Sequence, residues 1–204
     1  MTQRSTWLTA LLLATLAALA ISGIEPYDRL TWWMEVMPVL IALPILYFTR
    51  KRFPLTPLLY GLLFFHGLVL MLGAHYSYSR VPLGFWLQDW LDLARNHYDR
   101  IGHLAQGFVP AILAREILVR LSPLKPGGWL FFLVCCVALA VSATYEFVEW
   151  WASLLYGAEA NEFLATQGDI WDTQWDMLLA LIGCLVSQVL LSGWHDRQLS
   201  RYPK

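Results

Sequence analysis

Charge is scarce in this chain: Asp, Glu, Lys and Arg make up only 14% of its 204 residues, and the formal net charge is −1. Without a basic excess the chain has no general attraction for nucleic acid, so we expect no such partner. Hydrophobic residues instead make up 58% of the sequence and include 11 tryptophans. Soluble domains contain about 25% charged residues. The composition therefore indicates a protein that crosses the membrane several times.

Cysteine and known catalytic motifs are also lacking. The three cysteines, Cys135, Cys136 and Cys184, all lie in apolar runs, so we expect free thiols at lipid depth and no disulfide framework. The sequence contains no HExxH, CxxC, EF-hand or Gly-x-Ser-x-Gly pattern, and these absences remove the motif-based routes to a metalloprotease, a zinc ribbon or a serine hydrolase.

Six segments approach the roughly 20 apolar residues that a membrane-spanning helix needs. They lie near 6–24, 32–49, 55–74, 100–120, 129–150 and 175–194. We therefore predict one all-α membrane domain over residues 1–204, with about six spans. The first segment resembles a secretory signal, because Arg4 precedes a Leu/Ala-rich run, but we favour a retained helix.

The positions of Lys and Arg predict the orientation of these spans. With the N-terminus inside, ten of the 14 basic residues fall on the inner side, among them Arg4, the run 50–52 and Lys204. Inner loops are enriched in Lys and Arg, so an N-in, C-in topology is favoured. Between spans three and four, residues 84–95 place apolar and charged side chains on opposite sides. We predict that this segment is an interfacial helix on the outer leaflet.

Polar residues of three predicted spans reach the same outer depth. They are Asp99, His103 and Gln106 in the fourth span, Tyr145, Glu146 and Glu149 in the fifth, and Asp169, Asp172 and Asp176 in the sixth. Asp99 and His103 are four residues apart and so share a helix face. The sequence therefore predicts an outward-facing acidic pocket made by these three spans.

Part of this pattern has a simpler structural explanation. Asp99, Asp169 and Asp172 lie at predicted helix N-termini, where carboxylates cap free N–H groups. Glu146 and Glu149 lie at the C-terminal end of a span, where a carboxylate is unfavourable unless a positive charge compensates it. These two glutamates therefore most need a partner.

The compensating charge could come from Arg100, a protonated His103, protons on the acids or a bound divalent cation. Oxygen ligands favour Mg²⁺, Ca²⁺ or Mn²⁺, and a histidine ligand makes Zn²⁺ or Fe²⁺ possible. The predicted metal ligands are Glu146, Glu149, Asp172 and Asp176. The other predicted ligand-binding residues are Asp99, His103, Gln106, Tyr145 and Asp169. Asp99 would hold the tautomer of His103, as carboxylates behind metal-bound histidines do.

Other ionisable residues within the spans are weaker candidates. His66 in the third span and Glu35 in the second are functional suspects because charge is costly in the membrane, but each fits a local hydrogen-bonding role better. Arg115 and Glu116, near the inner end of the fourth span, are expected to extend to water.

Three stretches resemble the YjdF family of bacterial inner-membrane proteins. They are Tyr98–Phe108 (YDRIGHLAQGF), Tyr145–Trp151 (YEFVEWW) and Thr166–Met177 (TQGDIWDTQWDM). The resemblance covers most of the chain and implies an inner-membrane location, but it implies no reaction. The order of Asp99, Arg100 and His103, a late glutamate in the next span and aspartates before the last is also distantly similar to VanZ-like membrane proteins. Those proteins usually have an Arg before the aspartates, which we do not find between Leu154 and Asp169.

Four classes of function remain open from the sequence, and the fourth is a purely structural partner for another membrane protein. The leading hypothesis is an envelope protein whose acidic pocket binds a divalent cation or a cationic or lipid headgroup. The second is a metal-assisted hydrolase or transferase acting on a lipid-linked substrate, with His103 or Glu146 moving the proton. The third is a proton-coupled transporter. Against it, the chain shows no inverted repeats and no trail of acids toward the membrane midplane. The sequence does not predict an oligomeric state.

Overall fold

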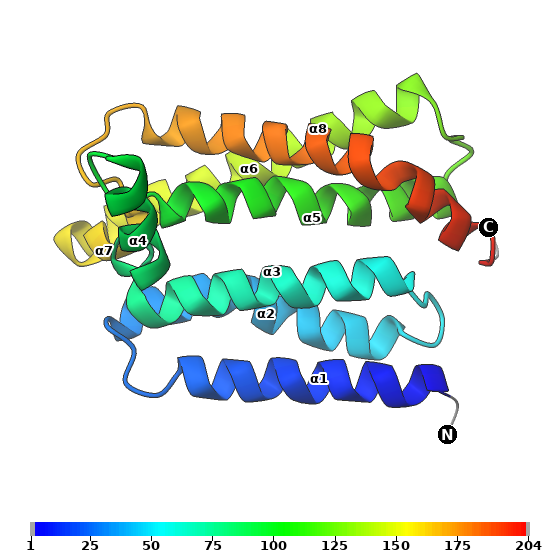
Figure 1. Cartoon of the computed structure of the whole chain (residues 1–204), viewed down its shortest axis with the longest axis horizontal. Coiled ribbons are helices and arrows are strands. Elements are labelled where there is room, and N and C mark those ends of the chain that lie inside the picture. The colour runs from blue at the N-terminus through cyan, green and yellow to red at the C-terminus, as the bar shows by residue number, and fades with distance from the viewer. Residues whose placement is uncertain (1–2, 203–204) are drawn as a thin grey trace.

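The structure, a computed structural model, describes residues 3–202, and side chains from residue 6 on. Long antiparallel helices run side by side, and both described ends of the chain lie at the same end of the bundle (Figure 1). The elements are α1 (Gln3–Ser22), α2 (Arg29–Thr49), α3 (Pro57–Tyr76), η1 (Tyr78–Arg80), α4 (Pro82–Leu91), α5 (Tyr98–Leu121), α6 (Gly128–Tyr156), η2 (Gly157–Ala160), α7 (Asn161–Leu164) and α8 (Asp172–Leu199). We call the end that carries α4 and α7 the α4 end, and the opposite one the terminal end.

Local sequence signals explain where several helices begin. Asp28 precedes α2 and its carboxylate accepts a hydrogen bond from the Thr31 N–H. Thr56 caps α3 in the same way, and Pro57 occupies the first helical position, where its missing N–H costs nothing. Both caps set the point at which a helix begins after a short loop. Because short loops join neighbouring helices in opposite directions, the antiparallel order follows from the sequence.

Helix α5 is the centre of the bundle and packs against α3, α6 and α8. Its closest neighbour is α8, because glycines remove the side chains between them. A Cβ atom at Gly107 would overlap the carbonyl of Ala180, and one at Gly183 would overlap the carbonyl of Leu104. Small residues at such positions let membrane helices approach backbone to backbone. Helix α1 lies at the edge and packs on α3 (Figure 1).

The all-α membrane fold expected from the sequence is confirmed. Four helical segments are long and apolar enough to cross a membrane by length and composition: α2, α3, residues 128–164 and α8; residues 6–22 form a shorter apolar helix. Helix α5 has 24 residues, about 36 Å, but carries charged side chains that the surrounding helices cover. The count of six spans therefore stays a prediction.

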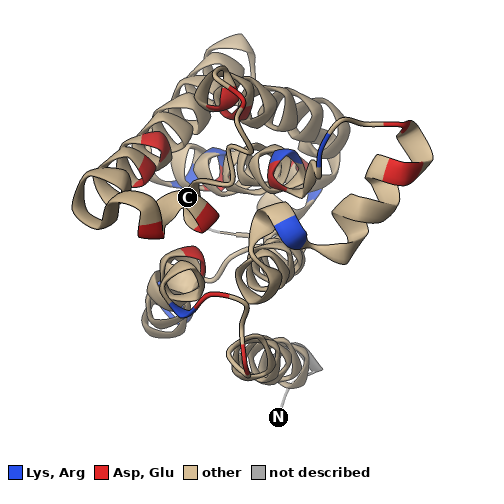
Figure 2. Ribbon diagram, turned by 90° about the vertical axis from the view of Figure 1, so that its left-hand side faces the viewer, with Lys and Arg blue, Asp and Glu red and all other residues tan. Residues whose placement is uncertain are grey.

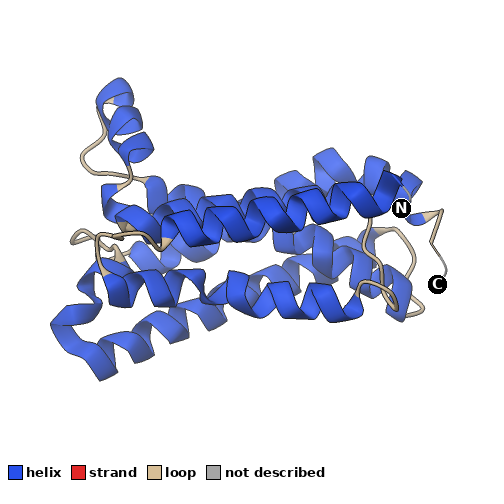
Figure 3. Ribbon diagram, turned by 90° about the horizontal axis from the view of Figure 1, so that it is seen from below, coloured by secondary structure: helices blue, strands red, loops and turns tan. Residues whose placement is uncertain are grey.

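The predicted helix boundaries differ from the observed ones at two places. Helix α6 extends to Tyr156 instead of residue 150, and η2 and α7 follow it without having been predicted. The interfacial segment, expected over residues 84–95, is helical only from Pro82 to Leu91, because Asp92 adopts a left-handed conformation with φ of 50°. Helix α4 runs crosswise to the long helices at one end of the bundle (Figure 3).

The N-in, C-in topology predicts that the α4 end faces the outside. Asp89 is exposed on α4 and Lys125 is exposed in the loop before α6, at the terminal end. In a background without the three native cysteines, we expect a membrane-impermeant maleimide to label Asp89→Cys in intact cells. Lys125→Cys should react only after permeabilisation, and the reverse pattern would overturn the orientation. Two residues counted in that topology are not covered by the structure: Lys204 lies outside the described residues, and the Arg4 side chain is not described.

Candidate functional site

Acidic side chains from three helices meet at the α4 end. Helix α5 contributes Asp99 and His103 near its start, α6 contributes Glu146 and Glu149 in its second half, and α8 contributes Asp176 one turn after its start. Figure 2 views the bundle along its helices from this end and marks the acidic and basic residues. The five residues, which we call the His103 cluster, come together because α5, α6 and α8 all pack against one another.

The His103 ring is held between an amide and two carboxylates. Its Nδ1 lies 3.0 Å from Oε1 of Gln106, and an amide oxygen only accepts, so Nδ1 donates. Its Nε2 lies 3.5 Å from Oδ1 of Asp99 and 3.8 Å from Oδ2 of Asp176. The Tyr145 ring packs edge-on against the imidazole at 6.1 Å. Gln106 therefore lies at the orienting nitrogen that was expected to face Asp99, and Asp99 joins Asp176 at Nε2.

Two sets of three residues within the cluster have ligand spacing. One atom each of Asp99, His103 and Asp176 lie within 4.8 Å of one another, and the same holds for His103, Glu146 and Glu149. His103, Glu146 and Asp176 are 5%, 7% and 1% exposed. His103 is thus within ligand spacing of Glu146 in one set and of Asp176 in the other, and all three side chains are buried. Such burial strongly disfavours a state in which all acids are ionised and uncompensated.

Two oxygen atoms in the cluster have no partner. Oε1 of Glu146 and Oδ1 of Asp176 are buried and form no hydrogen bond. Among the described residues, no Arg or Lys forms an ion pair with a member of the cluster. Buried polar atoms are nearly always hydrogen-bonded, so these two oxygens lack the partner that a proton, a water molecule or a ligand would supply.

The remaining two aspartates are paired with arginines instead. The Arg95 guanidinium lies 3.0 Å from Oδ2 of Asp169 and 2.8 Å from Oδ1 of Asp172, and Arg100 lies 3.1 Å from Asp169. Arg95 also donates to the Thr166 carbonyl. The structure thus places Asp172, expected as a metal ligand, and Asp169, expected as a ligand-binding residue, in an ion-pair network beside the His103 cluster.

Arg95 was missed as a site residue because the sequence pattern placed it on the polar side of an interfacial helix. That helix ends at Leu91, and the following loop turns Arg95 toward the start of α8. The only feature of the sequence that could have indicated an arginine partner was the excess of carboxylates over cations in the predicted pocket. The pKa of His97, just before α5, is lowered, first by burial and then by Arg100 and Arg95. His97 therefore stays neutral at pH 7 and adds no further positive charge.

A cavity of about 170 Å³ adjoins the cluster, and this cavity runs from the cluster along α3. Asp99, His103 and Glu149 line it, together with Glu35 and His66 from other helices. The Tyr145 hydroxyl donates to Oε2 of Glu35 at 3.3 Å. Nε2 of His66 is buried without a partner.

His66 is the tenth of the 20 residues of α3. A cavity with several ionisable side chains in its lining therefore reaches the middle of a candidate spanning helix, where the sequence showed no trail of acids. Pro110 also lines the cavity; it has no N–H, so the Gln106 carbonyl four residues earlier loses its helical partner. The cavity has room for several water molecules.

The helical fold and the His103 cluster define an all-α membrane protein with buried acidic groups and a histidine at one end of its bundle. The chain belongs to the family described as "Predicted membrane protein (DUF2238)", whose model matches residues 7–197. It is 54% identical over 181 residues to Inner membrane protein YjdF of Escherichia coli (strain K12), a match that covers 89% of this chain and 87% of the relative. No solved structure matches the chain.

These comparisons confirm the resemblance to the YjdF family and the expected location in the bacterial inner membrane. The more distant similarity to VanZ-like proteins stays a prediction. The family description and the name of the relative state a location and no activity, so the function has to be argued from the site.

Proposed function

We propose that this protein binds a divalent metal ion at the His103 cluster. The observation that carries the proposal is the pair of buried, unpartnered oxygens of Glu146 and Asp176, on two side chains that each lie within ligand spacing of His103. A cation placed among these atoms would satisfy both oxygens and compensate the excess negative charge. Protons on the acids are the competing explanation.

The ligand types favour a transition metal. Nε2 of His103 and carboxylate oxygens of Asp99, Asp176, Glu146 and Glu149 are the available donors. Imidazole together with carboxylates suits Mn²⁺, Fe²⁺ or Zn²⁺ better than Mg²⁺ or Ca²⁺, which prefer oxygen alone. Gln106, at the other ring nitrogen, would fix the imidazole in the tautomer that a metal needs.

Metal removal tests the proposal directly. We expect protein purified in mild detergent to contain about one Mn, Fe or Zn per chain by elemental analysis, and to lose it to a chelator. Returning the metal should raise the melting temperature, because a ligand that binds only the folded state stabilises it. A protein that carries no ion and whose melting temperature no divalent metal changes would refute the proposal.

The cavity supports a second candidate, metal-assisted hydrolysis or group transfer on a lipid-linked substrate. Catalytic metal sites keep an open position for water or substrate, and the space beside His103 and Glu149 would provide one. Whichever of His103 and Glu146 does not bind the metal would then move the proton. Release of a water-soluble product from labelled envelope lipids, absent in His103→Ala, would favour catalysis over binding alone.

A further inference from the structure

A long apolar groove lies between α2 and α6, with α5 as its floor. Its volume is about 1280 Å³. Helices α2 and α6 make hardly any direct contact, and α7 bridges them at the α4 end. The groove is lined by apolar side chains from all three long helices, including Ile41, Ile45, Leu113, Ile117, Val148 and Leu155. It therefore separates two spanning helices over much of their length.

The dimensions and position of the groove suit a lipid chain. Its lining on α2 runs from Met34 to Thr49, which is roughly 22 Å of helix and most of the ~30 Å hydrocarbon thickness. Several lining residues, such as Ile41 and Ile117, remain exposed although they line the groove, so the groove is open to its surroundings. An occupant of this groove thus enters sideways from the apolar part of the membrane.

The groove adjoins the cavity of the candidate site. Tyr145 and Pro38 line both. The Tyr145 ring lies 6.1 Å from the His103 ring and 6.3 Å from the ring of Phe163 on α7, and its hydroxyl donates to Glu35. The Tyr145 side chain is therefore the partition between the apolar groove and the polar cavity.

We propose that the ligand of the candidate site is a lipid: its chain lies in the groove between α2 and α6, and its polar headgroup reaches the cavity at Tyr145. This inference deepens the proposed function. Its headgroup part rests on that function, because the headgroup would bind the cation held by the His103 cluster. A lipid chain suits the groove better than a helix of a second copy, because a helix is ~10 Å wide and α7 bridges α2 and α6 at the α4 end.

Bulky substitutions in the groove test this assignment. Native mass spectrometry of the wild-type protein from mild detergent should show one retained lipid per chain. Ile117→Trp, on the floor of the groove, should lower the retained fraction at least ten-fold, and Ile41→Trp, on the α2 wall, should do the same if the first variant folds poorly. Val189→Trp is the matched control, because Val189 is equally apolar and exposed on α8 but does not line the groove.

The outcomes separate this inference from the metal proposal. Retained lipid that Ile117→Trp removes, in a protein that binds no metal, would support the groove and refute the metal site. Bound metal with equal lipid retention in Ile117→Trp and Val189→Trp would refute the groove alone. A dimer that dissociates in Ile117→Trp would show that a second copy covers the groove and would also overturn the inference.

Discussion

Replacing Asp176 by asparagine is expected to weaken metal binding on the order of 100-fold or more while leaving the protein folded. The side chain is 1% exposed, its Oδ2 faces His103 Nε2 and its Oδ1 has no partner. Asparagine keeps the shape but removes the charge that a divalent ion requires, and even residues behind the ligands change metal affinity 10–100-fold. The measurement is metal affinity by competition with a chelator of known strength.

The apo form of Asp176→Asn should be at least as stable as the wild type, because the substitution removes a buried charge without a partner. Asp172→Asn is the matched control: it changes a carboxylate one turn away on the same helix that Arg95 already neutralises. Its metal affinity should stay within several-fold of the wild type. Equal losses in both variants would mean that the overall acidity of the α4 end, and not the His103 cluster, binds the ion.

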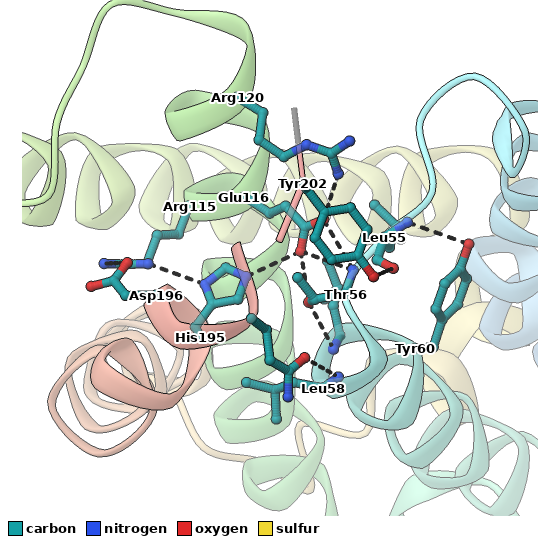
Figure 4. Close-up of polar contacts among 12 residues, drawn as sticks. Leu55, Thr56, Leu58, Tyr60, Arg115, Glu116, Arg120, His195, Asp196 and Tyr202 are labelled. Carbon is teal, nitrogen blue, oxygen red and sulfur yellow. Dashed lines mark hydrogen bonds and ion pairs between the residues drawn. The ribbon is translucent and has the colours of Figure 1, made fainter. Parts of the chain in front are cut away.

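Removing the Glu116 carboxylate should destabilise the protein by about 3–5 kcal/mol, the usual cost of breaking a buried ion pair. At the terminal end Glu116 is fully buried and accepts hydrogen bonds from Thr56, from Arg120 at 2.8 Å and from His195 at 3.0 Å. Figure 4 shows these partners pointing toward it from the residue before α3, from α5 and from α8. In Glu116→Ala all three lose their acceptor, so the melting temperature should fall on the order of 10 °C.

Glu159→Ala is the control for this loss, because Glu159 is exposed near the end of α6. Its melting temperature should match that of the wild type. Glu116→Gln should lie between the two, since an amide offers one acceptor oxygen where the carboxylate offers two. A Glu116→Ala protein as stable as the wild type would show that the network does not hold α3, α5 and α8 together.

The same network corrects an expectation from the sequence. Arg115 and Glu116 were expected to extend to water, yet both are buried. Arg115 contacts Nδ1 of His195 at 3.1 Å and Asp196 at 2.8 Å. A sequence shows that a charge lies near a helix end, but it does not show that a histidine on α8, 79 or more positions away, closes over it.

The position and length of the helices were largely predictable, because runs of apolar residues near membrane length leave few alternatives. The predicted helix ends were wrong where the conformation of a single residue sets the end of a helix. Asp92 ends α4 early by taking a left-handed conformation, and α6 continues through Trp151 to Tyr156. Such ends depend on local conformation and on packing under α7, which hydropathy does not report.

By itself, the sequence determined that this is an all-α membrane protein with three acid-bearing helix ends at one level, since helix length and antiparallel order place Asp99, Glu146 and Asp176 at the same depth. Only the tertiary structure decided how the carboxylates divide: Asp169 and Asp172 pair with Arg95, while Asp176 turns toward His103. The reason is physical, because the partner of a buried charge is set by the rotation and close approach of α5 and α8 and by the path of the loop before them. Neither leaves a pattern in the chain.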